Sequence, residues 1–362
     1  MDAEADATLD PEKVGLFSFL VFSKLEGAVT SAMVHLGDRL GLYRVLADAD
    51  GALSTTELAT RLGLDERWVR EWAYNQGAAQ IVQIDGDERL SLAPEAVAVL
   101  ADPDHPAFGV GSFHHLPQTM AALERLPESF RTGLGLDYDA HGPDCAEGIA
   151  RGFEPWMRAN LLPTVLPALD GVEARLRDGA RVLDIGCGAG GVALELAKAF
   201  PASRVTGYDI SQHALDLAKD RRTKAGLTNV DFLDPRESPM PVDGSADLIV
   251  TFDCLHDMTD PAGMAHAIRA ALADDGTWLL VDIKAHDTYA ENARRNPMAS
   301  LMYGTSVMSC MSSALSEPGG AGLGTLGLTA TVAEEMARDA GFTRFRLLDI
   351  DHPINALYEI RP

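Results

Sequence analysis

The sequence predicts an α/β protein in which a Rossmann-like, seven-stranded domain follows a mostly helical winged-helix domain. Beyond residue 179, short runs of valine, leucine and isoleucine alternate with helical stretches, which is typical of a parallel sheet with crossover helices. Before that point, helical periodicity dominates and is followed by a short hairpin pattern. A length of 362 residues also exceeds the usual size of one hydrophobic core, so we expect more than one domain.

The first domain, expected over residues 1–104, begins with a long apolar helix. Residues 11–47 have too many apolar positions for one face of a helix, so this segment needs a partner. Ser54 and Glu57 stand three residues apart and form the capping-box pattern that opens a short helix. A helix-turn-helix pattern follows, and residues 81–92 are expected to form the two-stranded wing.

The charge of the chain argues against nucleic acid as the partner of this winged helix. There are 30 Lys and Arg residues against 54 Asp and Glu, which gives a formal net charge of −24. Such a charge repels nucleic-acid phosphates and anionic membrane surfaces alike. The helix that would enter DNA, residues 65–74, has two arginines against three acids. We expect neither partner, and a winged-helix transcriptional regulator stays an alternative function.

Residues 105–178 are expected to form a helical bridge. Seven prolines interrupt this stretch, which favours several short helices over a sheet.

The start of the chain lacks the pattern of a targeting segment. It is acidic, and the apolar run 14–22 is too short to span a bilayer. The four cysteines form no C-x-x-C pair, so we expect reduced thiols in a cytoplasmic protein. No metal site is expected either, because the adjacent His114 and His115 would point about 100° apart on a helix.

Residues 179–362 are expected to contain the sheet, with one insertion at about 285–328. The strands are expected at 180–184, 204–209, 229–233, 247–252, 277–283, 344–350 and 355–360. Within the insertion, Met302 and Tyr303 belong to a methionine-rich stretch that either lines a site for an apolar acceptor or packs in a core. The glycine-rich residues 319–327 either hinge a lid or form a plain linker.

A glycine-rich turn after the first strand is the candidate cofactor loop. Glycine is needed where a ligand packs on the main chain, and the helix that follows offers free N–H donors. Gly186, Gly188 and Gly191 also fit the G-x-G-x-x-G pattern of dinucleotide-binding folds. Asp184, at the end of the strand, would repel a pyrophosphate but suits the ammonium and sulfonium charges of S-adenosylmethionine (SAM). The electrostatics therefore favour SAM over NAD.

Acidic residues also end the next two strands. Asp209 is placed to bind ribose hydroxyls, a role shared by NAD and SAM folds. Asp234 is placed to accept a hydrogen bond from an adenine amino group. Three acidic strand ends in this order are more specific than the glycine pattern alone.

His256, just beyond the fourth strand, is the candidate catalytic residue. In open parallel sheets, ligands bind at the carboxyl ends of the strands. If SAM donates its methyl group, the transfer needs alignment of the two substrates, and a hydroxyl acceptor must also lose a proton, which an imidazole can take. His256 instead has a structural role if it only hydrogen-bonds the following loop. Asp253 is expected near the methionine amine.

Three segments resemble the class I SAM-dependent methyltransferases: Val182-Leu-Asp-Ile-Gly-Cys-Gly-Ala-Gly190, Tyr208-Asp-Ile-Ser211 and Asp247-Leu-Ile-Val-Thr251. With the winged helix included, the whole chain resembles the small-molecule O-methyltransferases, and it is similar to mycobacterial and actinobacterial relatives. That resemblance implies a homodimer through the N-terminal domain. It leaves the acceptor open, together with C- or N-methylation and a non-methylating SAM-fold enzyme.

The resemblance also implies site residues. The cofactor site would comprise Asp184, Gly186, Cys187, Gly188 and Gly190 around the methionine part, Asp209 and Ile210 at the ribose, Asp234 and Pro235 at the adenine, and Phe252 and Asp253. Phe153-x-x-x-Met157 resembles a stretch that contacts cofactor and acceptor in plant O-methyltransferases. Leu255-His-Asp-Met-Thr-Asp260 resembles the stretch that carries their base. Asp282 matches one acid that flanks this histidine, whereas Gly327 stands where the second is expected.

Overall fold

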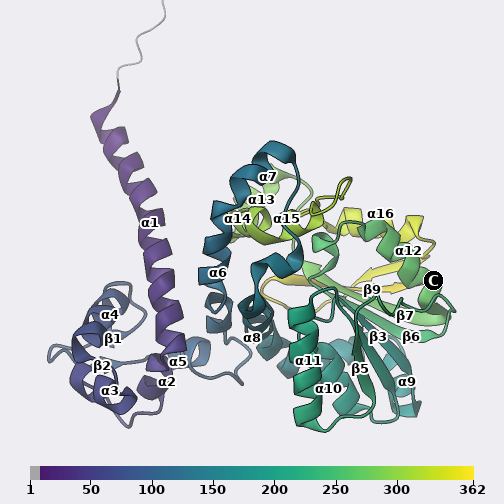
Figure 1. The fold of residues 1–362 in the computed structure, drawn as a ribbon, viewed down its shortest axis with the longest axis horizontal. Coiled ribbons are helices and arrows are strands. Elements are labelled where there is room, and N and C mark those ends of the chain that lie inside the picture. Colours follow the sequence, from purple (N-terminus) through teal and green to yellow (C-terminus); the bar gives the residue numbers. More distant parts are fainter. Residues whose placement is uncertain (1–8) are drawn as a thin grey trace, which may run out of the picture. The chain divides into compact units, whose positions relative to one another are not determined.

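The computed structural model describes residues 9–362, which divide into two compact units. One unit holds the described residues up to Pro103 together with Ala107–Leu116, and the other holds Asp104–Pro106 and Pro117–Pro362. In Figure 1 the first unit is purple to blue, and the second runs from blue through green to yellow. Each unit has a hydrophobic core of its own.

The first unit consists of helices and one short hairpin. Its elements are α1 (Pro11–Arg39), α2 (Leu42–Ala47), α3 (Thr55–Leu62), α4 (Glu66–Ala78), β1 (Gln83–Ile84), β2 (Leu90–Ser91), α5 (Pro94–Leu100) and the short helix η1 (Val110–Phe113). The capping box between Ser54 and Glu57 opens α3. The antiparallel pair β1 and β2 forms the wing, so the predicted winged helix is confirmed.

The expectation of one continuous helix over residues 11–47 is wrong, because the chain breaks at Gly41. Gly41 has φ +74°, a left-handed conformation that glycine adopts without steric cost. Beyond the break, Tyr43 of α2 packs edge-to-face on Trp72 of α4, with ring centroids 5.5 Å apart. Its hydroxyl donates to Gln76 Oε1 at 2.5 Å. The break therefore brings α2 into the core of this unit.

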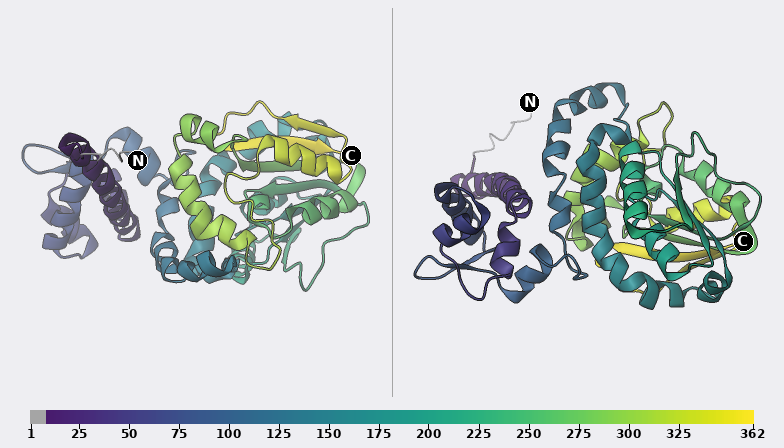
Figure 2. Two further views of the ribbon diagram at one scale, coloured as in Figure 1. Left: turned by 90° about the horizontal axis from the view of Figure 1, so that it is seen from above. Right: turned by 60° about the horizontal axis from the view of Figure 1, so that its bottom comes forward.

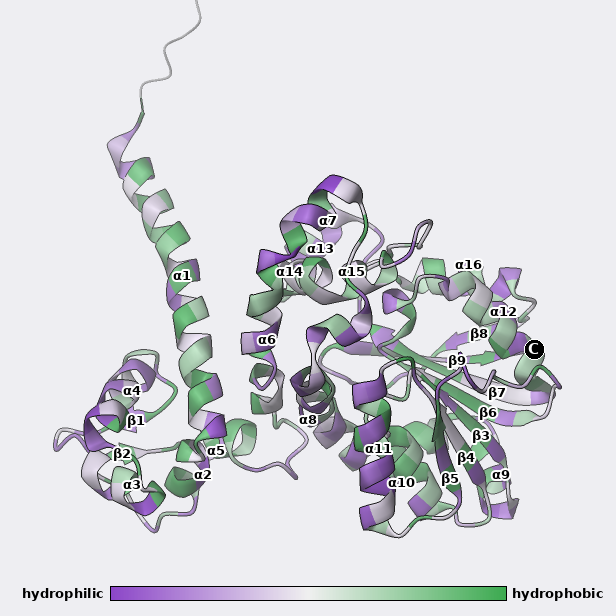
Figure 3. Ribbon diagram, in the orientation of Figure 1, coloured by the Kyte–Doolittle hydropathy of each residue, from purple (hydrophilic) through white to green (hydrophobic). Residues whose placement is uncertain are grey.

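The first turns of α1 expose apolar side chains. The buried residues of α1 all lie from Thr30 onward. Eight large apolar side chains before that point are between 50% and 75% exposed: Leu16, Phe17, Phe19, Leu20, Val21, Phe22, Leu25 and Val29. Figure 3 shows the same hydrophobic character along the helix. By length and composition alone, α1 is the one described helix that is long and apolar enough to cross a membrane.

The second unit contains, within the described residues, one sheet of seven strands in the order β5-β4-β3-β6-β7-β9-β8. The strands are β3 (Arg181–Ile185), β4 (Arg204–Tyr208), β5 (Val230–Leu233), β6 (Ala246–Phe252), β7 (Leu272–Ile283), β8 (Arg344–Leu347) and β9 (Asn355–Arg361). The first five are parallel, and β9 pairs antiparallel with β7 and β8. The predicted strands are confirmed, with β7 starting earlier and β8 ending earlier than expected.

Helices cover both faces of this sheet (Figure 2). One face packs against α8 (Pro143–Asn160), α9 (Val172–Asp178), α10 (Gly191–Ala199) and α11 (Gln212–Ala225), and the other against α12 (Pro261–Ala271) and α16 (Ala330–Asp339). Adjacent residues of β3 show the alternation, because Val182 belongs to the first core and Leu183 to the second. Because β3 to β7 run parallel, their carboxyl ends lie together at one edge of the sheet.

The proline-rich bridge and the late insertion pack on each other. The bridge forms α6 (Leu116–Ala121), η2 (Ala122–Glu124), α7 (Leu126–Thr132), η3 (Tyr138–His141) and then α8, η4 (Leu161–Val165) and η5 (Leu166–Ala168). The insertion forms α13 (Tyr289–Arg295), α14 (Ala299–Thr305), the π-helical turn η7 (Ser306–Cys310) and α15 (Met311–Ala314). Leu126 and Leu136 of the bridge pack with Val307 and Met308 of η7.

Candidate active site

The turn after β3 is shaped by three glycines with positive φ. Gly186, Gly188 and Gly190 have φ values of +69°, +52° and +80°, all in the left-handed region. A Cβ on Gly186 would also lie 2.5 Å from the Cβ of Cys254, so a larger residue does not fit there. The turn leads directly into α10, whose first N–H groups face the loop. This local geometry is what the sequence pattern predicted.

Asp184 lies beneath this turn and is 2% exposed. Its Oδ2 accepts a hydrogen bond from the backbone N–H of Ala193 at 3.2 Å. Burial raises the pKa of Asp184 to about 7, against the opposite effect of that hydrogen bond. Among residues 9–362, no basic side chain offsets this effect of burial on Asp184.

Asp209, at the end of β4, holds the same loop from the other side. Its carboxylate accepts from the N–H groups of Gly188 and Ser211, both at 2.8 Å. Burial raises its pKa despite these hydrogen bonds. Asp139 of η3 accepts from the N–H of Gln212 at 3.0 Å and from the Ser211 hydroxyl, so the bridge adds a second acid here. No sequence motif indicated Asp139 as a site residue, because it is far from Asp209 along the chain.

Asp234, at the end of β5, is already paired with an arginine. Arg236 donates to it through Nε at 2.9 Å and Nη2 at 2.6 Å, and this interaction lowers the pKa of Asp234. The same guanidinium donates to the carbonyl of Ile210 at 2.7 Å. Arg236 thus ties together the two strand ends that the sequence assigned to the ribose and the adenine. Pro235 lies between the two paired residues.

His256 lies in η6 (Leu255–Asp257), directly after β6, and is 2% exposed. Its Nδ1 is 2.6 Å from Oδ1 of Asp282, at the end of β7. Its Nε2 is 3.2 Å from Oδ1 of Asp257. Burial by itself would lower the pKa of His256, but the charges of Asp282 and Asp257 together raise it well above its usual range. Two carboxylates therefore stabilise a proton on this imidazole.

The second acid beside His256 is thus Asp257, where the resemblance left only Gly327. Gly327 instead closes a turn by donating to the carbonyl of Gly324 at 2.9 Å. Gly324 in turn donates to the carbonyl of His256 at 3.2 Å. The glycine-rich segment therefore contacts the backbone of His256, the predicted catalytic residue.

Asp253 lies between the cofactor loop and His256. It has φ +48°, unusual for a residue other than glycine, and its Oδ1 accepts from the side-chain amide of Asn355 in β9. Burial, followed by the charge of Asp282, raises the pKa of Asp253 to about 8. The ring of Phe252 packs edge-to-face on Phe153 of α8, with centroids 5.6 Å apart. These residues meet from three separate parts of the chain.

The remaining predicted site residues are placed as follows. Met157 is 1% exposed and packs within the core beneath the sheet, a position that gives no support to its predicted contact with an acceptor. Tyr303 of α14 packs on Tyr289 of α13, with ring centroids 5.9 Å apart. Met302 lies on the same helix and is partly exposed. Cys187 is buried, with its thiol near the carbonyl of Gly188.

Two stretches of the chain match known domain families. Residues 176–317 match the family described as a methyltransferase domain, and residues 28–101 match the Rv2258c-like winged HTH domain.

Two curated methyltransferases match this chain over part of their length. The 27-O-demethylrifamycin SV methyltransferase of Amycolatopsis mediterranei is 39% identical over 26% of this chain and 35% of its own. The (S)-tetrahydroprotoberberine N-methyltransferase of Eschscholzia californica is 29% identical over 33% of this chain and 34% of its own. The chain therefore spans about a third of the length of these two relatives.

Solved structures match along nearly the whole chain. Human N-acetylserotonin methyltransferase in complex with SAM has a TM-score of 0.70 at 17% identity, over 100% of this chain and 99% of its own. A putative O-methyltransferase from Nostoc punctiforme has a TM-score of 0.71 at 16% identity, over 98% and 100%. The predicted fold class, enzyme class and cofactor class are thereby confirmed at the level of the domain family. Residues 176–317 thus match a methyltransferase domain and residues 28–101 an Rv2258c-like winged helix-turn-helix domain, and the chain has the fold of these solved methyltransferases.

Proposed function

We propose that this protein transfers a methyl group from SAM to a hydroxyl of a small molecule, with His256 as the general base. The observation that carries the proposal is the pairing of His256 Nδ1 with Asp282 at 2.6 Å, at the carboxyl edge of the sheet. A histidine held in this way presents Nε2 for proton transfer, because the hydrogen bond fixes the other ring nitrogen. The choice of a hydroxyl group as the methyl acceptor depends on this role of His256.

The buried carboxyls fit a cationic cofactor. SAM supplies a methyl group on a positively charged sulfur, and its methionine part adds an ammonium group. Asp184 is buried and Asp253 is partly buried, and desolvation raises the pKa of each, to about 7 and about 8. A ligand with positive charge restores the ionised form of such groups. We assign Asp184, Asp253 and the glycine turn to the methionine part, and Asp209 to the ribose.

The residues of this chain perform three tasks in the proposed reaction. The glycine turn and the acids orient the donor. The loop of η6, covered by the glycine-rich segment through Gly324 and His256, keeps water from the reacting atoms. The neutral form of His256 takes the acceptor proton on Nε2, and Asp282 and Asp257, whose charges raise the pKa of His256, stabilise the imidazolium that results.

The experiment measures S-adenosylhomocysteine release with a panel of phenols as acceptors. His256→Ala is expected to lower kcat/KM by roughly 10²–10⁴-fold, the usual contribution of a general base. Binding of S-adenosylhomocysteine, measured by calorimetry, should stay nearly unchanged, because His256 lies outside the glycine turn. Unchanged turnover in the variant would remove His256 from the mechanism.

N-methylation is a second candidate, which the matches to plant N-methyltransferases favour. A neutral amine is already a nucleophile and needs no base. An amine acceptor should therefore tolerate His256→Ala, whereas a phenol should not.

We also propose that the protein is a homodimer through α1. The support is the run of exposed apolar side chains between Leu16 and Val29. Single helices of a stable protein rarely expose apolar residues on every side. A second copy of the same helix would cover them.

A DNA-binding role has less support. Arg67 and Arg70 of α4 are paired with Glu71 and Glu66, each at 2.5 Å, so their charges are neutralised within the helix. For the cell compartment we propose the cytoplasm, because all four cysteines are free thiols.

A further inference from the structure

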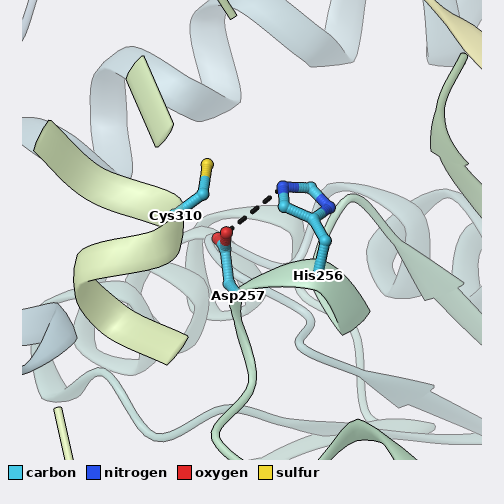
Figure 4. A group of neighbouring side chains, drawn as sticks. All are labelled: His256, Asp257 and Cys310. Carbon is cyan, nitrogen blue, oxygen red and sulfur yellow. Dashed lines mark ion pairs between the residues drawn. The ribbon is translucent and has the colours of Figure 1, made fainter. Parts of the chain in front are cut away.

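The imidazole of His256 belongs to a second cluster, which comprises His256, Asp257 and Cys310. Each residue offers one ligand atom, and these atoms all lie within 4.8 Å of one another. Figure 4 shows the three side chains converging from η6 and from the end of η7. The insertion thus brings a thiol to a histidine and a carboxylate that lie far from it in the sequence.

One buried polar atom of this cluster lacks a hydrogen bond. Asp257 Oδ1 is buried and, among the described residues, has no hydrogen-bond partner. The ion-pair distance of 3.2 Å to His256 Nε2 lacks the geometry of a hydrogen bond. A buried carboxylate oxygen without a hydrogen-bond donor is costly, so a metal ion that takes the place of the proton on Nε2 would stabilise this oxygen.

Asp282 supplies the interaction that a metal-binding histidine normally has. It is hydrogen-bonded to Nδ1 of His256, so Nε2 is the nitrogen left to face Asp257 and Cys310. Histidine ligands of metals almost always pair their other ring nitrogen with a carboxylate, a carbonyl or water. The side chain of Asp257 is 18% exposed, which leaves an approach for an ion.

We propose that His256, Asp257 and Cys310 bind a zinc ion through Nε2, a carboxylate oxygen and Sγ. A nitrogen, oxygen and sulfur set suits Zn²⁺, whereas Mg²⁺ and Ca²⁺ avoid thiolates. Zinc bonds of about 2.0–2.3 Å require the three atoms to draw together from their present separation by side-chain rotation. Three protein ligands leave a fourth position for water or another ligand.

The consequence for turnover rests on the proposed function. A zinc ion on Nε2 occupies the atom that would take the acceptor proton. Zinc is therefore expected to inhibit O-methylation reversibly, and a chelator is expected to restore it.

Binding is tested without activity, by titrating Co²⁺ into the purified full-length protein under reducing conditions and then displacing it with Zn²⁺. A thiolate ligand gives a charge-transfer absorption band in the near ultraviolet, and tetrahedral Co²⁺ gives intense visible bands. Cys310→Ser should remove the ultraviolet band. Asp282→Asn should weaken zinc affinity by about 10- to 100-fold, the usual cost of losing such a partner. Mg²⁺ should not displace the cobalt.

Cys145→Ser is the matched control, because Cys145 is also a buried free thiol but lies outside the three-residue cluster. It should keep both bands. The proposal is overturned if no tetrahedral cobalt spectrum forms, or if the ultraviolet band follows Cys145 and not Cys310. Loss of metal binding with normal methyl transfer would reject only the zinc site. Zinc binding by a protein that never consumes SAM would reject only the proposed function.

Discussion

Asp184 is a carboxyl that the fold buries beside one backbone N–H, at 3.2 Å. Its raised pKa, about 7, means that the folded protein prefers the protonated form. A raised carboxyl pKa favours folding below the unfolded value, and that contribution is lost as the pH rises through about 7. This residue therefore costs stability at pH 8 in exchange for attraction to a cation.

Asp184→Asn is expected to gain thermal stability relative to the parent protein as the pH rises from 5 to 8. One pKa unit corresponds to about 1.4 kcal/mol, so the difference in the free energy of unfolding should exceed about 1 kcal/mol. Melting curves of both proteins without ligand measure it. Binding of S-adenosylmethionine should be weakened in the variant and, in the parent, should weaken as the pH falls below 7. A constant difference across this range would contradict the assignment.

Asp282 fixes the orientation of His256, so Asp282→Asn should impair turnover without removing the base. The loss in kcat/KM is expected to reach roughly 10²-fold with a weakly acidic phenol, within the range of general-base catalysis. It should shrink with more acidic phenols, which need less help to lose a proton. A series of acceptors of different acidity provides the measurement, and an equal loss for all of them would argue against proton transfer.

At the scale of single residues, the sequence predicted those acids that stand at or just after the end of a strand. Asp184, Asp209 and Asp282 are examples, because the end of a strand can be recognised from periodicity. Asp139 and Asn355 were not found, because each reaches the site from another element. Asp257 was overlooked although it adjoins His256, since spacing alone does not give the direction of a side chain.

The turn between β3 and α10 shows how an element depends on a single missing side chain. Gly186→Ala is expected to destabilise the fold by roughly 1–3 kcal/mol beyond the strain of its positive φ, because the new Cβ overpacks against Cys254. Gly188→Ala is the matched control, since Gly188 also has positive φ but no atom within 4 Å of the added Cβ. It should cost only the backbone strain of about 1–2 kcal/mol. Chemical denaturation of both variants provides the comparison, and equal costs would show that the clash is relieved.

Helices and strands with a regular pattern of apolar residues were predicted well. The break between α1 and α2 was not predicted. The strands of the sheet follow from runs of apolar residues between helices. The break at Gly41 was missed because the apolar pattern continues on both sides of it. Only the packing of Tyr43 on Trp72 makes the two-helix arrangement favourable.

At the scale of the whole molecule, the apolar surface of α1 needs a partner. Phe17→Asp combined with Phe19→Asp is expected to turn a dimer into a monomer, because charged groups cannot be buried without a counterion. Light scattering after gel filtration measures the mass. The control is Phe130→Asp, which changes a side chain that is 78% exposed in the other unit. A parent protein that is monomeric in solution would reject the proposed dimer.

The amino-acid sequence by itself determined the order of strands and helices, the glycine turn and the acids at the strand ends. These features are local, since each is encoded by neighbouring residues and the period of the backbone. Tertiary structure alone decided what surrounds His256, including the thiol of Cys310 and the backbone of Gly324. Those contacts join segments more than fifty residues apart, and only the packing of the insertion against the sheet domain sets them.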